Sequence, residues 1–141
     1  MSTLEWFYAG DQALMAAGWE QSASLEDAPF VSASANFSLH LSEWFEDLVE
    51  AVCAASAVPV MSRQEVLPEL LREDDGSTLE RVSPTFVRIV AALSELQLDA
   101  VAREWLARGL SPDARSALTE LGEVCRVASS GGLAVVFAVT A

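Results

Sequence analysis

The stretch Leu133-Ala-Val-Val-Phe-Ala-Val139 decides the fold. All seven residues are apolar, so a strand formed here would bury both of its faces. Such a strand is typical of the centre of a sheet that is covered on both sides. Seven residues are far fewer than the about 20 that span a membrane. We therefore expect a sheet that is completed by the last strand of the chain.

Two further segments have the pattern of strands. Residues 4–9 are short and aromatic, and a glycine follows them. Residues 31–40 alternate with period two, which indicates a half-buried strand. The face that we expect to be buried consists of Val31, Ala33, Ala35, Phe37 and Leu39.

Helix signals fill most of the remaining chain. We expect helices at residues 11–17 with Asp11 as the cap and Gly18 as the end, at 42–55, at 62–71, from Ser83-Pro84, from Asp99 to Gly109, and from Ser111 to about 128. Residues 73–81 have the composition of a loop. The pattern predicts a single α+β domain over residues 1–141. Its small sheet has about three strands, including the C-terminal one, and five to six helices cover it.

The charge composition excludes some functions. The 141 residues include 21 acids, eight arginines and no lysine, for a net charge of −13. Residues 1–62 hold nine acids and no Lys or Arg. Direct binding to nucleic acid phosphates or to an anionic membrane needs a positive surface, so neither is expected. The alanine- and arginine-rich composition indicates a GC-rich bacterial genome, and the lack of a basic N-terminal leader favours the cytoplasm.

No catalytic or metal signature is present. Cys53 and Cys125 are 72 residues apart without zinc spacing, and we expect buried free thiols. His40 is the only histidine, so a nucleophilic triad would depend on it alone. Ser129-Ser130-Gly131-Gly132 has the composition of an anion-binding loop, but a strand follows it rather than a helix. We expect no catalytic, cofactor-binding or metal-binding residues and, more generally, no enzyme.

One predicted helix carries a concentrated set of acids. Glu43, Glu46, Asp47 and Glu50 recur at i, i+3, i+4 and i+7, without a base at helical spacing. This face could be simply solvated, could bind a hard cation, or could meet a basic partner that relieves the repulsion. Trp44 adjoins Phe45, so one of the two aromatic side chains points away from the apolar stripe. Exposed aromatics are typical of interface anchors, and the predicted partner-binding set is therefore Glu43, Trp44, Glu46, Asp47 and Glu50.

Parts of the chain resemble the YfbM-like family of small bacterial proteins. The similar stretches are residues 83–93 (Ser-Pro-Thr-Phe-Val-Arg-Ile-Val-Ala-Ala-Leu), the helix at 112–128 with Gly131-Gly132-Leu133-Ala134-Val135-Val136, and residues 41–48 (Leu-Ser-Glu-Trp-Phe-Glu-Asp-Leu). The resemblance rests on apolar pattern and covers about half of the chain. The basic turn that usually precedes the last strand of the family is only partly matched. The resemblance implies an α+β fold and, because the family has no settled activity, no site residue.

These observations lead to a hypothesis about function. We expect a non-enzymatic interaction protein that binds, and inhibits, a basic protein, as bacterial immunity proteins do. One alternative is an acidic mimic of nucleic acid that blocks a DNA- or RNA-binding protein. The other is a small ligand-binding domain or enzyme that uses His40.

Overall fold

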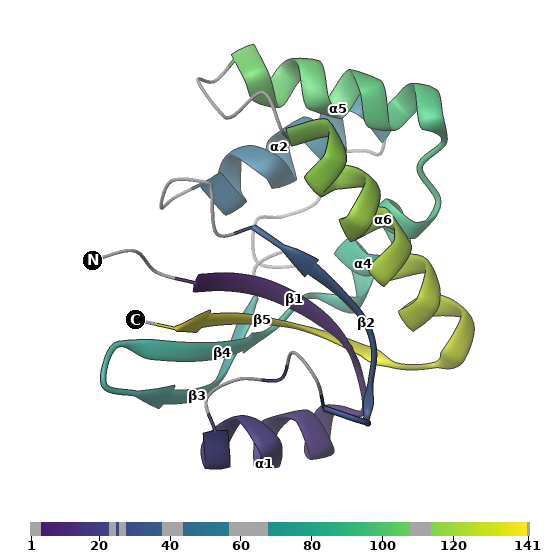
Figure 1. Cartoon of the computed structure of the whole chain (residues 1–141). Coiled ribbons are helices and arrows are strands. Elements are labelled where there is room, and N and C mark those ends of the chain that lie inside the picture. Colours follow the sequence, from purple (N-terminus) through teal and green to yellow (C-terminus); the bar gives the residue numbers. More distant parts are fainter. Residues whose placement is uncertain are drawn as a thin grey trace.

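The computed structural model describes residues 4–22, 25, 28–37, 44–56, 68–107 and 114–140. Its elements, in chain order, are β1 (Leu4–Gly10), α1 (Gln12–Ser22), β2 (Val31–Asn36), α2 (Trp44–Ser56), β3 (Glu69–Asp74), β4 (Ser77–Arg81), α4 (Pro84–Ala91), α5 (Glu95–Ala107), α6 (Ala114–Gly131) and β5 (Ala134–Thr140) (Figure 1). The fold is α+β, as the sequence predicts.

The strands form one antiparallel sheet in the order β2-β1-β5-β4-β3. The central place of β5 confirms the prediction from its apolar sequence, and Val135, Val136, Phe137 and Ala138 are all buried. The predicted sheet of about three strands is wrong, because the described residues contain five.

The two strands that the sequence did not predict form a hairpin. Strands β3 and β4 are joined by Asp75 and Gly76, whose φ angles are 49° and 85°. Positive φ at both central residues is the type I′ turn, which suits the twist of a two-residue hairpin. The prediction of a loop at 73–81 is therefore wrong. The predicted helix at 62–71 is also wrong over residues 69–71, which belong to β3. Both strands contain many charged residues, so their sequences lack the alternation of apolar and polar residues that predicts a strand.

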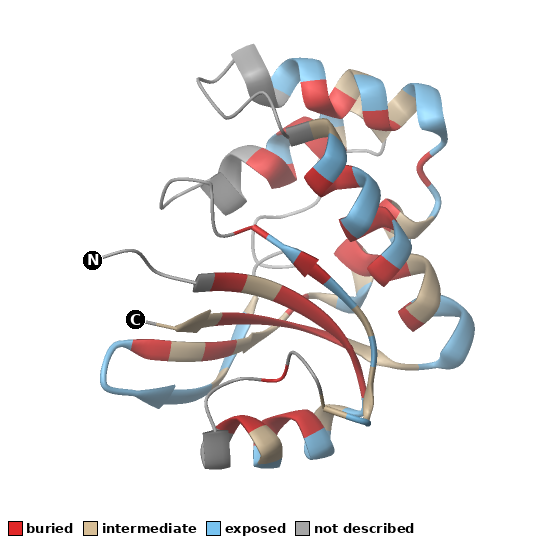
Figure 2. Cartoon of the chain, viewed as in Figure 1, coloured by how far each residue is buried: buried red, intermediate tan, exposed pale blue. Residues whose placement is uncertain are grey.

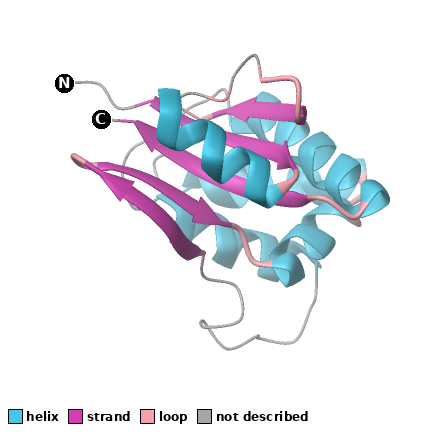
Figure 3. Cartoon of the chain, turned by 90° about the horizontal axis from the view of Figure 1, so that it is seen from below, coloured by secondary structure: helices cyan, strands magenta, loops and turns pink. Residues whose placement is uncertain are grey.

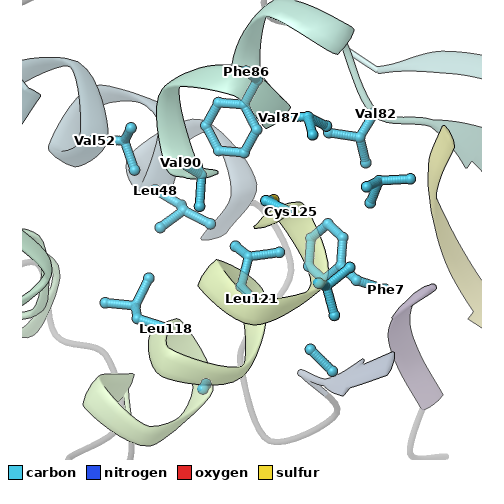
Figure 4. Close-up of a cluster of buried hydrophobic side chains, with 14 of the residues drawn as sticks. Phe7, Leu48, Val52, Val82, Phe86, Val87, Val90, Leu118, Leu121 and Cys125 are labelled. Atoms are coloured by element: carbon cyan, nitrogen blue, oxygen red, sulfur yellow. The ribbon is translucent and has the colours of Figure 1, made fainter. Parts of the chain in front are cut away.

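Helices cover the two faces of the sheet unequally. Of the helices that the structure describes, Figures 1 and 3 show α1 on one face and α2, α4, α5 and α6 on the other. The red segments of Figure 2 lie where these helices face the sheet and each other. The larger core lies on the four-helix side and includes Leu48, Val90, Leu118 and Leu121 (Figure 4). The smaller core lies beneath α1 and includes Met15, Trp19, Leu79 and Val136.

Strand β1 contributes to both cores through alternate residues. Phe7 is fully buried on the four-helix side, where its ring centroid lies 5.0 Å from that of Phe37 and 4.7 Å from that of Phe137. Tyr8 points to the α1 side and stacks on Trp6, with 5.9 Å between the ring centroids. The prediction of a strand at 4–9 is confirmed.

Strand β2 follows the predicted alternation with one exception. Ala33, Ala35 and Phe37 belong to the four-helix core, as expected, but Val31 packs against the core beneath α1. The cause is a shift in register, because Ala9 pairs with Ala33 whereas Gly10 pairs with Val31. An extra residue of this kind reverses the side to which the strand's side chains point. Leu39 and His40 lie outside the described residues.

Helix α1 begins where its cap predicts and ends later than expected. The carboxylate of Asp11 accepts a hydrogen bond of 3.0 Å from the N–H of Leu14. The helix continues through Gly18, which does not end it. A Cβ atom at position 18 would lie 2.6 Å from Cζ of Phe30, so the glycine admits this aromatic ring.

The other helix boundaries also differ in detail. Helix α4 begins at Pro84, as predicted. Helix α5 begins at Glu95 rather than at Asp99, because Ser94 and Gln97 form a reciprocal capping box. The predicted end of one helix at Gly109 and the predicted start of the next at Ser111 lie outside the described residues. Helix α6 ends at Gly131 with Gly132 at a φ of 65°, and the N–H of Leu133 donates to Ala128, as in a Schellman motif.

Candidate functional site

Helix α2 carries most of the predicted partner-binding residues. Its buried side consists of Leu48, Val49, Ala51 and Val52, and the helix packs mainly against α5. Glu50 is exposed. Trp44, Glu46 and Asp47 lie on this helix, but their side chains are outside the described part of the structure, and Glu43 lies outside it altogether. The helix contains three acids and no Lys or Arg.

Three acids of α5 and α6 have an arginine close by. The guanidinium of Arg115 on α6 lies 2.6 Å from the carboxylates of both Glu95 and Asp99 on α5, and it also hydrogen-bonds Thr119. The hydrogen bond to Asp99 raises the pKa of Arg115. On α6 itself, Arg126 lies 3.2 Å from Glu123. Arginines thus pair with Glu95, Asp99 and Glu123, whereas the sequence of α2 contains no Lys or Arg.

A second acidic surface is present on the β3–β4 hairpin. Glu73, Asp74 and Asp75 at its tip are all exposed. The hairpin projects beyond the helices at the edge of the sheet (Figure 1). Within the described residues, no group of three or more His, Cys, Asp or Glu side chains is placed to hold a metal ion. The composition at 73–75 is typical of a loop, so the sequence does not predict that a strand pair carries these acids.

Neither cysteine has the environment of a nucleophile. Cys125 lies in the larger core (Figure 4), where burial raises the pKa of its thiol to about 12. Cys53 is half-buried, and burial raises its pKa as well. Reactive cysteines require the thiolate, so both thiols are protonated and unreactive near neutral pH. His40 is outside the described residues, and a role for it stays a hypothesis.

A depression of about 380 Å³ lies between α4 and the C-terminal end of α6. Arg81 at the end of β4 and Arg88 on α4 supply its positive charges, and Gln12 and Ser129 its neutral polar groups. The other lining residues are Val82, Pro84, Val87, Ala128, Gly132, Leu133, Ala134 and Val135. No acid is among them. Sequence reasoning missed this cluster, because Arg81 and Arg88 are remote from residues 128–135 along the chain.

One acid is partly enclosed by the sheet. Glu80 on β4 lies beside Phe137 on β5 in the register of the sheet. Burial raises the pKa of its carboxyl group above the usual value of 4.5. Its partner Phe137 belongs to the larger core, so Glu80 lies on the face of the sheet that α2, α4, α5 and α6 cover. The charge of Glu80 is therefore a cost to the fold rather than a contribution to an ion pair.

Comparison with known proteins returned no match to a family model, to a curated protein or to a solved structure. The resemblance to the YfbM-like family therefore stays a prediction. Across the described ranges, no helix is both long and apolar enough to cross a membrane.

Proposed function

We propose that this protein is a non-enzymatic interaction protein that binds a basic polypeptide through residues 43–50. The observation that carries the proposal is the charge of α2, which holds three acids and no base over 13 residues. The side chains of α2 therefore carry a formal charge of −3. Like charges at helical spacing repel each other, and a cationic partner would relieve that repulsion.

The fold supports such a role for α2. The apolar stripe of the helix is used in packing, and Glu50 is exposed on its other side. The backbone of a helix anchored in this way is already ordered, so it loses little conformational entropy on binding. Opposite charge on the partner accelerates the encounter, and this acceleration falls as salt screens the charges. The acidic tip of the β3–β4 hairpin adds to the same long-range field.

The test compares two variants with the same change in charge. In the first, Glu46→Arg and Glu50→Arg alter α2. In the control, Glu104→Arg and Glu120→Arg alter exposed residues of α5 and α6. Immobilised wild-type protein at low salt captures its partner from a lysate of the source cells, and association rates are then measured with the purified partner.

We expect the α2 variant to associate at least tenfold more slowly than wild type, with a much weaker salt dependence. The control should keep most of the wild-type rate. Equal rates for both variants, or a rate that does not vary with salt, would remove α2 from the interface. If nucleic acid competes with this protein for the captured partner, the partner is a nucleic-acid-binding protein and the acids act as phosphate mimics.

A further inference from the structure

We propose that the depression between α4 and α6 binds a small organic anion, with its carboxylate or phosphate at Arg81 and Arg88. Two of the eight arginines of a chain with net charge −13 line this one depression, and no acid lines it. This site is separate from the acidic face of α2.

Five elements, α1, β4, α4, α6 and β5, contribute lining residues to the depression. Arg81 ends β4 and Arg88 lies in α4, two segments joined directly along the chain. Helix α6 packs against α4, and its Schellman end carries Ser129 and Gly132 to the opposite wall. A Cβ atom at Gly132 would meet nothing within 4 Å, which is consistent with a wall that faces open space. Gln12, in the first turn of α1, also lines the depression.

The two arginines are held more loosely than Arg115. Arg115 lies 2.6 Å from two carboxylates. Arg81 has Glu69 at 3.9 Å, the limit of an ion pair, and that glutamate is largely exposed. In the described part of the chain, Arg88 hydrogen-bonds only the hydroxyl of Thr85, at 3.4 Å. Both guanidinium groups therefore retain donors for an oxyanion, which guanidinium binds with matched geometry.

The size and lining of the depression define the class of ligand. A volume of about 380 Å³ lies within the range of small-molecule sites, about 300–1,000 Å³. Val82, Val87 and Leu133 provide apolar surface beside the arginines. Inorganic phosphate alone would leave this surface unused, whereas an anion with an apolar body would cover it. The hydroxyl of Ser129 and the amide of Gln12 offer further hydrogen bonds.

The experiment is a titration of the full chain, followed by ¹H–¹⁵N NMR spectra at low salt. Phenyl phosphate and benzoate are the test ligands, inorganic phosphate lacks the apolar body, and benzyl alcohol lacks the charge. We expect phenyl phosphate or benzoate to shift the signals of residues 81–88 and 128–135, with inorganic phosphate weaker and benzyl alcohol without effect. The stronger of the two anions identifies the oxyanion as phosphate or carboxylate.

Variants locate the binding. Arg81→Gln and Arg88→Gln should each weaken binding roughly tenfold, the value of a charged hydrogen bond. The matched control Arg103→Gln removes an exposed arginine of α5 that does not line the depression, and it should leave the affinity unchanged. Leu133→Ala should reduce the preference for phenyl phosphate over inorganic phosphate. Equal weakening by Arg103→Gln, shifts spread over all arginines, or no binding at 20 mM ligand would overturn the proposal.

Discussion

Phe7 offers the sharpest test of how the sheet is held together. Its ring is fully buried and contacts Phe37 on β2 and Phe137 on β5, so one side chain connects three strands. Phe7→Leu keeps the residue apolar and removes both aromatic contacts. Such pairs contribute about 0.5–1.5 kcal/mol each beyond burial, so we expect a loss of about 1–3 kcal/mol in the free energy of unfolding. Truncation to alanine should cost about 3–5 kcal/mol, a large share of the about 5–15 kcal/mol typical of a domain.

Urea unfolding followed by far-ultraviolet circular dichroism measures these losses. A double-mutant cycle with Phe37→Leu should give a coupling of about 0.5–1.5 kcal/mol between the two rings. Trp6→Leu is the control, because Trp6 is only half-buried and its ring stacks on that of Tyr8, on the other face of the sheet. A coupling near zero between Phe7 and Phe37, or a larger loss from Trp6→Leu than from Phe7→Leu, would refute this account of the core.

Three further predictions concern backbone and charge. Gly10→Ala should destabilise the fold strongly, because its Cβ would lie 2.4 Å from the carbonyl oxygen of Phe30. Gly122→Ala should instead stabilise α6 by up to about 1 kcal/mol through helix propensity. Urea unfolding of both variants checks that their free energies of unfolding change in opposite directions. Ser94→Ala should cost about 1 kcal/mol by removing the cap of α5, measured in the same way. Burial raises the pKa of Glu80, so wild-type stability should fall as pH rises from about 4.5 through that raised value. Glu80→Gln should remove this fall, and unfolding curves between pH 3 and pH 7 would show it.

The strands differ in how far sequence could predict them. The six residues of strand β5 ahead of its last residue are all apolar, and only a central strand buries both faces, so its position followed from composition. Strands β3 and β4 carry charges on many positions and depend on pairing for their structure. The dipeptide Asp75-Gly76 was the available signal, because it is typical of a type I′ turn, but the surrounding acids favoured a loop.

The candidate sites differ in the same way. The acids of residues 43–50 are close in sequence, so helical periodicity alone predicted their common face. The depression at Arg81 and Arg88 is made from the start of α1, the end of β4, α4, and the link from α6 to β5. No local pattern connects these segments, and chain topology alone brings them together.

The features that the sequence determined by itself are those that depend on local interactions and on burial. The α+β class, the cap at Asp11, the start of α4 at Pro84 and the central β5 depend on neighbouring residues and on burial, which can be read along the chain. Tertiary structure decided the rest. The bulge that turns Val31 towards α1, the continuation of α1 through Gly18 and the placement of residues 128–135 beside Arg81 and Arg88 depend on contacts between distant segments, whose energies no local pattern contains.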